Sequence, residues 1–75
     1  MAQVTMETLG ERLVVLRRRS GLSLSQVATS TGASTSAISR YERDKADPPS
    51  KIVRALARVY GVSTDELLDF DATRR

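Results

Sequence analysis

The 75-residue sequence contains no cysteine, no histidine and no tryptophan. Without cysteine the chain has no disulfide and no thiolate zinc site. Without histidine it lacks an imidazole metal ligand and an acid–base group that titrates near neutral pH. No motif supports a nucleophile–base pair or a metal site built from the remaining residue types. The sequence therefore predicts no enzymatic activity, no metal, no cofactor and no small-molecule substrate.

Long apolar runs are also absent, although 40% of the residues are hydrophobic. No run approaches the roughly 18 residues that a membrane span requires, and the N-terminus has no apolar signal-peptide segment. We therefore expect a soluble, cytoplasmic protein that does not interact with membranes. The length is that of one domain, for which we expect residues 1–75 with a core over 7–70 and flexible termini.

Lysine and arginine are concentrated in the middle of the chain. The formal net charge is only +3 and the pI is near 10.0, but residues 12–58 hold ten basic and three acidic residues, a local charge of +7. Residues 61–75 instead hold four acids and two arginines. The basic segment is either a set of ordinary solvated helix faces or a surface that binds a polyanion.

Capping signatures and apolar spacing predict helices throughout the chain. A hydroxyl residue is followed three positions later by an acid or amide at Thr8 with Glu11, Ser23 with Gln26, and Ser63 with Glu66. Apolar residues recur at helical spacing, and no stretch alternates with period two. The prediction is an all-α fold with helices at about 8–19, 24–30, 35–43, 50–60 and 64–69.

The third predicted helix has a small, polar and basic face. If Ser34 caps this helix, an advance of about 100° per residue places Thr35, Ser36, Ser39, Arg40 and Arg43 within an arc of roughly 140°. Short side chains let a helix backbone approach a partner closely, as insertion into the DNA major groove requires. The alternative is an ordinary exposed helix whose first hydroxyls are caps.

A short helix and a tight turn at Gly32 precede this segment, which is the order of a helix-turn-helix. Residues 9–68 resemble the DNA-binding domain of the phage repressor and Cro-like (XRE) helix-turn-helix family. The resemblance rests on the order and spacing of these landmarks: the helix from Gly10 to Arg17, GLS at 21–23, VA at 27–28, Gly32, Ile38 with Ser39, Tyr41 with Glu42, Pro48, Ala57, GVS at 61–63 and DELL at 65–68.

The resemblance implies a compact five-helix bundle in which helices two and three form the helix-turn-helix and helix three reads DNA. Thr35, Ser36 and Arg40 match the base-contacting positions of the family, with Ser39 beside them, so the resemblance implies that these four residues contact bases. Arg40 is the strongest candidate for sequence choice because arginine can bind guanine through two hydrogen bonds, although it can also lie against a phosphate. The DNA backbone would be contacted by Ser23, Ser25, Gln26, Ser34, Arg43, Lys45 and Lys51.

Two positions depart from the family pattern. Leu24 stands where a glutamine that clamps the DNA backbone is frequent, so that contact would pass to Ser25 or Gln26, with Gln26 more engaged in its own cap. Asp44 stands where glycine commonly ends helix three, and the expected contact for its charge is Arg43 or Lys45. Aspartate tolerates the left-handed conformation at modest cost, so the turn should survive.

The family also implies an ion pair between Arg17 and Glu42 that links helix one to helix three. Because one recognition helix covers few base pairs, a homodimer on a palindromic operator is expected. Its interface is predicted at apolar residues beyond the core stripe, namely Ile52, Val59, Leu68 and Phe70. The sequence thus predicts a transcriptional regulator that binds double-stranded DNA. The alternative is an antitoxin-like or adaptor protein that acts through protein–protein contacts.

Overall fold

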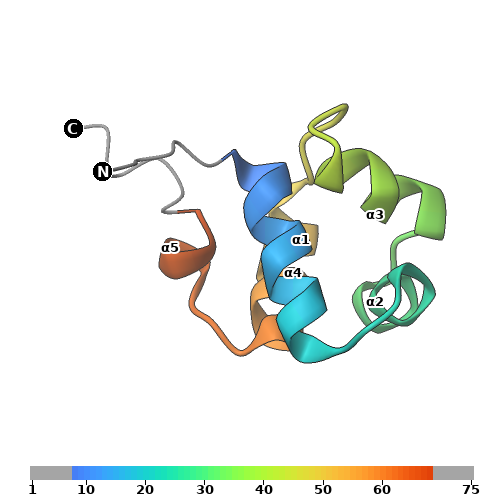
Figure 1. Cartoon of the computed structure of the whole chain (residues 1–75). Coiled ribbons are helices and arrows are strands. Elements are labelled where there is room, and N and C mark those ends of the chain that lie inside the picture. The colour runs from blue at the N-terminus through green and yellow to red at the C-terminus, as the bar shows by residue number, and fades with distance from the viewer. Residues whose placement is uncertain (1–7, 69–75) are drawn as a thin grey trace, which may run out of the picture.

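A computed structural model of the chain describes residues 8–68, which form five α-helices and no strand (Figure 1). The helices are α1 (Leu9–Ser20), α2 (Leu24–Thr31), α3 (Thr35–Glu42), α4 (Ser50–Tyr60) and α5 (Thr64–Leu67). The all-α prediction is confirmed. Helix α1 begins one residue later than predicted because Thr8 is its N-cap, and α3 ends one residue earlier because Arg43 is its C-cap. Helix α5 ends at Leu67 rather than at residue 69, which lies outside the described residues.

Reciprocal side-chain caps begin three of the helices, as the sequence predicted. At α1 the Glu11 backbone N–H donates to Thr8 Oγ1, and the Thr8 N–H donates to the Glu11 carboxylate, both over 3.1 Å. Ser23 with Gln26 and Ser63 with Glu66 form the same pair of bonds at α2 and α5. These bonds satisfy amides of a first turn that have no partner within the helix.

The helices are arranged with α1 and α4 at the centre (Figure 1). Helices α2 and α3 pack against each other on one side, where α2 also contacts α4 and α3 contacts α1. Helix α5 lies on the opposite side and contacts α4 and α1. The α2–α3 pair therefore packs against the two longer helices, and its outer side is exposed.

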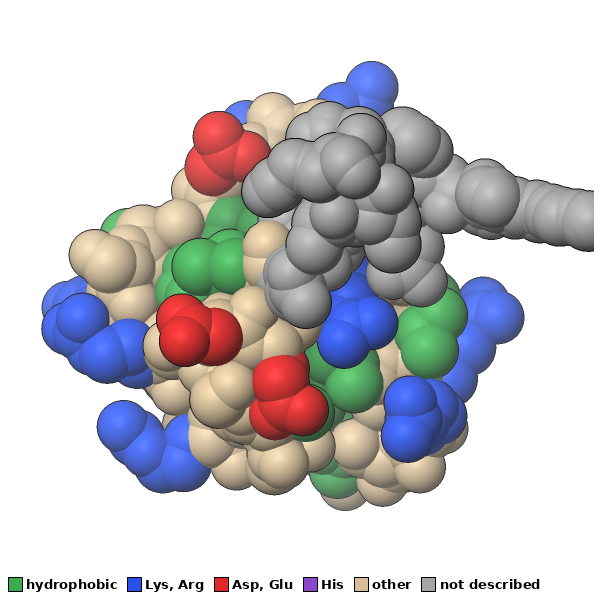
Figure 2. All heavy atoms as spheres, turned by 90° about the vertical axis from the view of Figure 1, so that its left-hand side faces the viewer, with side chains coloured by type: hydrophobic (Ala, Val, Ile, Leu, Met, Phe, Trp, Pro, Cys, Tyr) green, Lys and Arg blue, Asp and Glu red, His purple; other side chains and the backbone are tan. Residues whose placement is uncertain are grey.

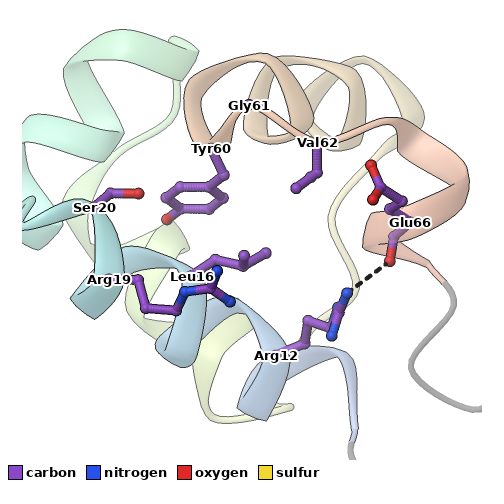
Figure 3. Close-up of a pocket in the computed structure, with 8 residues that line it drawn as sticks. All are labelled: Arg12, Leu16, Arg19, Ser20, Tyr60, Gly61, Val62 and Glu66. Atoms are coloured by element: carbon purple, nitrogen blue, oxygen red, sulfur yellow. Dashed lines mark hydrogen bonds between the residues drawn. The ribbon is translucent and has the colours of Figure 1, made fainter.

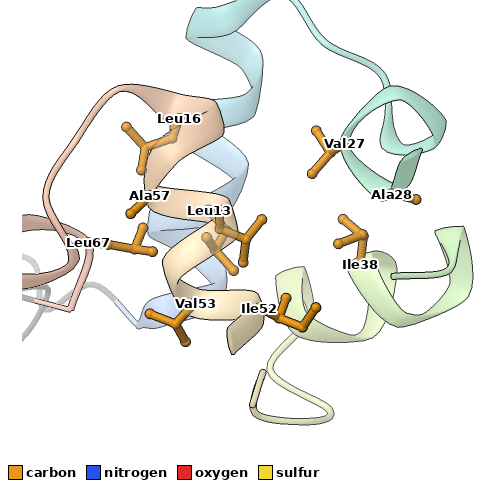
Figure 4. Close-up of a cluster of buried hydrophobic side chains, with 10 residues drawn as sticks. Leu13, Leu16, Val27, Ala28, Ile38, Ile52, Val53, Ala57 and Leu67 are labelled. Atoms are coloured by element: carbon orange, nitrogen blue, oxygen red, sulfur yellow. The ribbon is translucent and has the colours of Figure 1, made fainter. Parts of the chain in front are cut away.

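Every helix contributes to one hydrophobic core (Figure 4). The buried side chains are Leu13, Leu16, Val27, Ala28, Ile38, Ile52, Val53, Leu56, Ala57 and Leu67. Full burial of a side chain of this size stabilises a fold by about 1.5–3 kcal/mol relative to exposure. The single buried residue of α3, Ile38, thus anchors that helix to the rest of the domain.

The position of Ile52 corrects the predicted dimer interface. Ile52 is only 7% exposed and belongs to the core cluster, so it has almost no surface to offer a second chain. The sequence pattern did not identify Ile52 as a core residue, because Ile52 is adjacent to Val53 and lies beside the apolar stripe that contains Val53. In the structure both residues are buried.

None of the helices within residues 8–68 is long and apolar enough to cross a membrane. Within the same residues, no group of three acidic side chains is close enough to hold a metal ion.

Candidate nucleic-acid interface

Helices α2 and α3 are joined by a tight turn that two residues define. Gly32 ends α2 in the left-handed conformation, with φ of 79°, and its N–H donates to the Ala28 carbonyl. Ser34 then starts α3, accepting a hydrogen bond of 3.0 Å from the Ala37 N–H. A residue with a Cβ is strained at such a φ, so glycine lets the chain reverse within three residues. The geometry is that of a helix-turn-helix unit.

The exposed face of α3 carries the side chains that the sequence analysis selected for base contact. Thr35, Ser36 and Arg40 are exposed, and Ser39 is half-buried. The opposite face is turned inward through Ile38. All four selected residues line one open hollow of about 400 Å³, together with Arg43 from the end of α3 and Leu24 from α2. The hollow therefore brings hydroxyls and two guanidinium groups together on one surface.

The residues predicted to contact the DNA backbone fall into two groups, and of these residues Arg43 lines the hollow. Ser23 and Gln26 are exposed at the start of α2 but are bound to each other in the capping box, with Ser25 exposed between them. The expectation that Gln26 serves its own cap is confirmed by the 2.8 Å hydrogen bond that the Ser23 N–H donates to Gln26 Oε1. Ser34 caps α3 in the same way.

The basic members of this set are all exposed. Arg43 follows α3 directly, Lys45 lies in the loop after it, and Lys51 is in the first turn of α4. The loop is tied to α3 because the Lys45 N–H donates to the Arg40 carbonyl over 2.9 Å. Positive charge therefore continues from the hollow along the loop toward α4.

Arg17 and Glu42 form the ion pair that the sequence analysis expected. Arg17 donates through Nε and NH2 to the two carboxylate oxygens of Glu42, over 2.7 and 3.1 Å, and through NH1 to the Leu22 carbonyl over 3.1 Å. The side chains are 18% and 7% exposed. The hydrogen bond that Arg17 donates to the Glu42 carboxylate raises the pKa of Arg17 above its ordinary value. The pair neutralises an acid next to the basic surface and fixes α3 to α1.

Asp44 does not make the contact that the sequence predicted. Its carboxylate accepts hydrogen bonds from the Thr8 hydroxyl over 2.6 Å and from the Gly10 N–H over 2.9 Å, both at the start of α1. Its backbone is left-handed, with φ of 59°. A carboxylate at a helix N-terminus is favourable because it meets unpaired amides and the positive end of the helix dipole. Asp44 thus joins the loop after α3 to α1.

The sequence did not identify Gly10 as the hydrogen-bond partner of Asp44. A Cβ at this position would lie 2.5 Å from the Glu42 carbonyl oxygen and 2.7 Å from the Asp44 carboxylate. Only glycine lets α1 and the end of α3 approach so closely. A glycine within an otherwise regular helix was the available signal.

A second hollow, of about 360 Å³, lies between α1 and the junction of α4 and α5 (Figure 3). Arg12 NH2 donates to the Glu66 backbone carbonyl across it, over 3.3 Å. The Tyr60 hydroxyl is buried and has no hydrogen-bond partner among the described residues. Burial raises the pKa of Tyr60 from 10.0 to about 12, with a smaller contribution from the charge of Glu42. The hydroxyl is therefore neutral in the folded protein at physiological pH.

Figure 2 shows the flank of the molecule on the α5 side. Acidic and basic side chains are mixed on this face, with apolar groups between them. The acids of α5, Asp65 and Glu66, contribute to the C-terminal excess of negative charge. Leu68, 47% exposed, is also at this end, whereas Val59 is half-buried and Phe70 lies outside the described residues.

Comparison with known proteins identifies the class of fold. Residues 8–70 match the family described as helix-turn-helix domain, and the chain belongs to that family. It aligns with a crystal structure of the P22 c2 repressor protein in complex with a synthetic operator, at a TM-score of 0.82 and 29% identity, over 87% of this chain and 98% of the other. A complex of SinR protein and SinI protein matches with a TM-score of 0.77 and 32% identity, over 83% of this chain and 61% of the other. The resemblance to phage repressors is thereby confirmed.

Curated relatives carry the same domain within longer chains. The HTH-type transcriptional regulator ImmR of Bacillus subtilis is 36% identical over 64 residues, which are 85% of this chain and 50% of that protein. The HTH-type transcriptional regulator PuuR of Escherichia coli is 40% identical over 57 residues, which are 76% of this chain and 31% of that protein. The chain therefore spans half or less of the length of these relatives.

Proposed function

We propose that this chain binds double-stranded DNA sequence-specifically and acts in transcription regulation, with α3 in the major groove. The observation that carries the proposal is the hollow on the exposed face of α3, lined by Thr35, Ser36, Ser39, Arg40 and Arg43. Small side chains there allow close approach to base edges, and the two arginines supply the charge. The names of the relatives, which are transcriptional regulators and a repressor, support the same class.

Base contacts are assigned to Thr35, Ser36, Ser39 and Arg40, which point outward from α3. Arg40 pairs with guanine, since its fork of donors fits the two acceptors on that base, and the hydroxyls bind a wider range of bases. Arg43, Lys45 and Lys51 bind phosphates, Arg43 through its planar guanidinium and the two lysines as compact positive charges. Ser23, Ser25, Gln26 and Ser34, which lie at two helix N-termini, orient the protein on the phosphate backbone.

The acting unit is a homodimer on a palindromic operator, because a single α3 of eight residues covers only a few base pairs. Val59, Leu68 and Phe70 are the interface residues of this proposal. Leu68 supports it best, being a large apolar side chain that is 47% exposed at the flank away from α2 and α3. This position would leave both recognition helices accessible. A DNA ligand also implies a cytoplasmic location, in contact with the nucleoid.

The test is selection from a pool of random duplex DNA at moderate salt, followed by sequencing of the retained fraction and sedimentation velocity of the protein. We expect a palindrome with half-sites about one helical turn apart, and a dimer at micromolar concentration. Arg40→Ala should change the enriched sequence at one position of each half-site, whereas Ser30→Ala, an exposed serine of α2 outside the hollow, should not. Salt-sensitive binding without enrichment would contradict sequence-specific recognition.

One observation favours a second candidate, an antitoxin-like or adaptor protein that works through protein contacts. A solved complex of SinR protein with SinI protein contains the same fold. Val15 and Leu68 are large apolar side chains, 45% and 47% exposed, that could contact a protein. Absence of any enriched DNA, combined with retention of a partner protein on the immobilised chain, would favour this candidate.

A further inference from the structure

The hollow on α3 has one apolar wall that does not come from α3. Leu24 is the first residue of α2, directly after the capping serine, and is half-buried against the core. Its remaining surface lines the same hollow as Thr35, Ser36, Ser39, Arg40 and Arg43. Apart from the short Thr35 methyl and the methylene stems of the arginines, every other group offered there is polar.

We propose that Leu24 is a specificity-determining residue and that its side chain receives the C5-methyl group of a thymine in each half-site. This inference rests on the proposed function, because it requires α3 to enter the major groove. It goes further by assigning to α2 a base contact that discriminates one base from the other three.

The chemistry of the major groove singles out thymine. Guanine, adenine and cytosine present hydrogen-bonding groups and at most a C–H along that edge, whereas thymine adds a methyl group beside its O4 acceptor. A leucine pressed against a polar edge would leave a donor or acceptor without water or a partner, which is unfavourable. A leucine pressed against a methyl removes apolar surface from water on both sides.

The local structure fixes the position of Leu24 before any contact with DNA. Ser23 and Gln26 bind each other in the capping box, with hydrogen bonds of 2.8 and 3.0 Å, so α2 begins rigidly at this residue. The core packing of Leu24 limits its rotamers further. The neighbouring Thr35 and Ser36 hydroxyls, from the start of α3, can bind the O4 that lies next to the methyl.

The experiment removes single methyl groups from the DNA. Each thymine of the operator recovered by selection is replaced in turn by deoxyuridine, symmetrically in both half-sites, and affinity is measured by fluorescence anisotropy. Burial of one methyl group corresponds to about a fourfold gain in affinity. Replacing the contacted thymine in both half-sites removes two methyl groups, so it should weaken binding about fifteenfold. Leu24→Gln should abolish the difference between thymine and uracil at that position, and Leu24→Met should retain it.

The control is Val15→Gln, the same kind of change at an exposed apolar residue of α1 that does not line the hollow. It should leave the uracil effect unchanged, and thermal melts establish that each variant is folded. An enriched operator whose thymines all tolerate uracil, or an equal uracil effect in Leu24→Gln, would overturn the inference and leave the proposed function intact. Failure to enrich any sequence would overturn both.

Discussion

The Glu42 side chain is largely buried and is paired with Arg17. Its carboxylate is 7% exposed and receives two hydrogen bonds from Arg17, which also binds the Leu22 carbonyl. A charge buried to this degree is tolerated only when it is paired, and removal of one partner leaves the other without compensation. The pair thus keeps a negative charge beside a basic surface and leaves little of that charge exposed to solvent.

Glu42→Ala should lower the free energy of unfolding by about 3 kcal/mol, because it strands a partly buried guanidinium. Urea denaturation measures this. The double variant Glu42→Leu with Arg17→Met should recover most of the loss, since it replaces the pair by apolar groups of similar volume. A single variant as stable as the wild type would show that the pair contributes nothing to folding.

Asp44 combines a left-handed backbone, with φ of 59°, and two hydrogen bonds to α1. These contributions can be separated by two substitutions. Asp44→Gly removes the bonds but suits the backbone, and we expect a loss of about 1 kcal/mol. Asp44→Ala removes the same bonds but keeps a Cβ in the left-handed backbone, so it should cost about 1 kcal/mol more than Asp44→Gly. Equal losses in the two variants would mean that the backbone strain is negligible.

Tyr60 makes the free energy of unfolding depend on pH in the alkaline range. Its pKa is raised by burial to about 12 in the folded protein from an ordinary value of 10.0, so the folded state keeps the proton that the unfolded state loses. The titration of this group leaves stability unchanged below pH 10 and lowers it as the pH rises from 10 toward 12, because only the unfolded state ionises in that interval. Tyr60→Phe should therefore flatten the decline of stability over this interval, measured by urea denaturation at a series of pH values.

The same substitution has a second expected effect at neutral pH. The buried Tyr60 hydroxyl has no hydrogen-bond partner in the described residues, so Tyr60→Phe removes an unsatisfied polar group and should stabilise the protein by about 1 kcal/mol. A destabilised variant would mean that the hydroxyl is hydrogen-bonded in solution.

At the scale of elements, α3 is a short helix that depends on its ends and on one anchor. It has eight residues, one buried side chain and a cap from Ser34. Isolated helices of this length are unstable in water, so the cap, Ile38 and the Arg17–Glu42 pair together hold it in place. The element proposed to read DNA is therefore rigid because its neighbours hold it.

Ser34→Ala should lower the free energy of unfolding by about 1 kcal/mol, because the Ala37 N–H loses its acceptor. Ser36→Ala is the matched control, the same chemical change two residues further along the helix where the side chain is exposed. It should leave thermal stability nearly unchanged. Equal destabilisation by the two substitutions would argue that the cap contributes no more than any serine of this helix.

At the scale of the whole molecule, charge is distributed unevenly between its two sides. Arg40, Arg43 and Lys45 follow one another at the end of α3 and in the loop after it, whereas α5 on the opposite side carries Asp65 and Glu66. Such a distribution orients an approaching polyanion toward one face.

The proposed dimer predicts a steep dependence of DNA affinity on salt. With Arg43, Lys45 and Lys51 on phosphates in each protomer, about six contacts give a slope of log K against log salt concentration of about −5. Lys45→Ala should reduce the magnitude of the slope by about 2 in the dimer. Asp65→Asn, which changes the net charge by one unit on the far flank, should leave it unchanged. A slope that Lys45→Ala leaves unaltered would exclude a phosphate contact at this residue.

The helices, their caps and the turn at residue 32 follow from the order of the amino acids alone, because each depends on neighbours within four residues along the chain. The capping pairs at Thr8, Ser23 and Ser63 and the glycine at residue 32 carry that information directly. Three other features depend on the three-dimensional packing: Ile52 is core, Asp44 binds the start of α1 and Leu24 faces the hollow of α3. Each of these depends on which helices pack against each other. Contacts between residues far apart in the chain, such as Gly10 with Asp44, leave no periodic signal in the order of the amino acids.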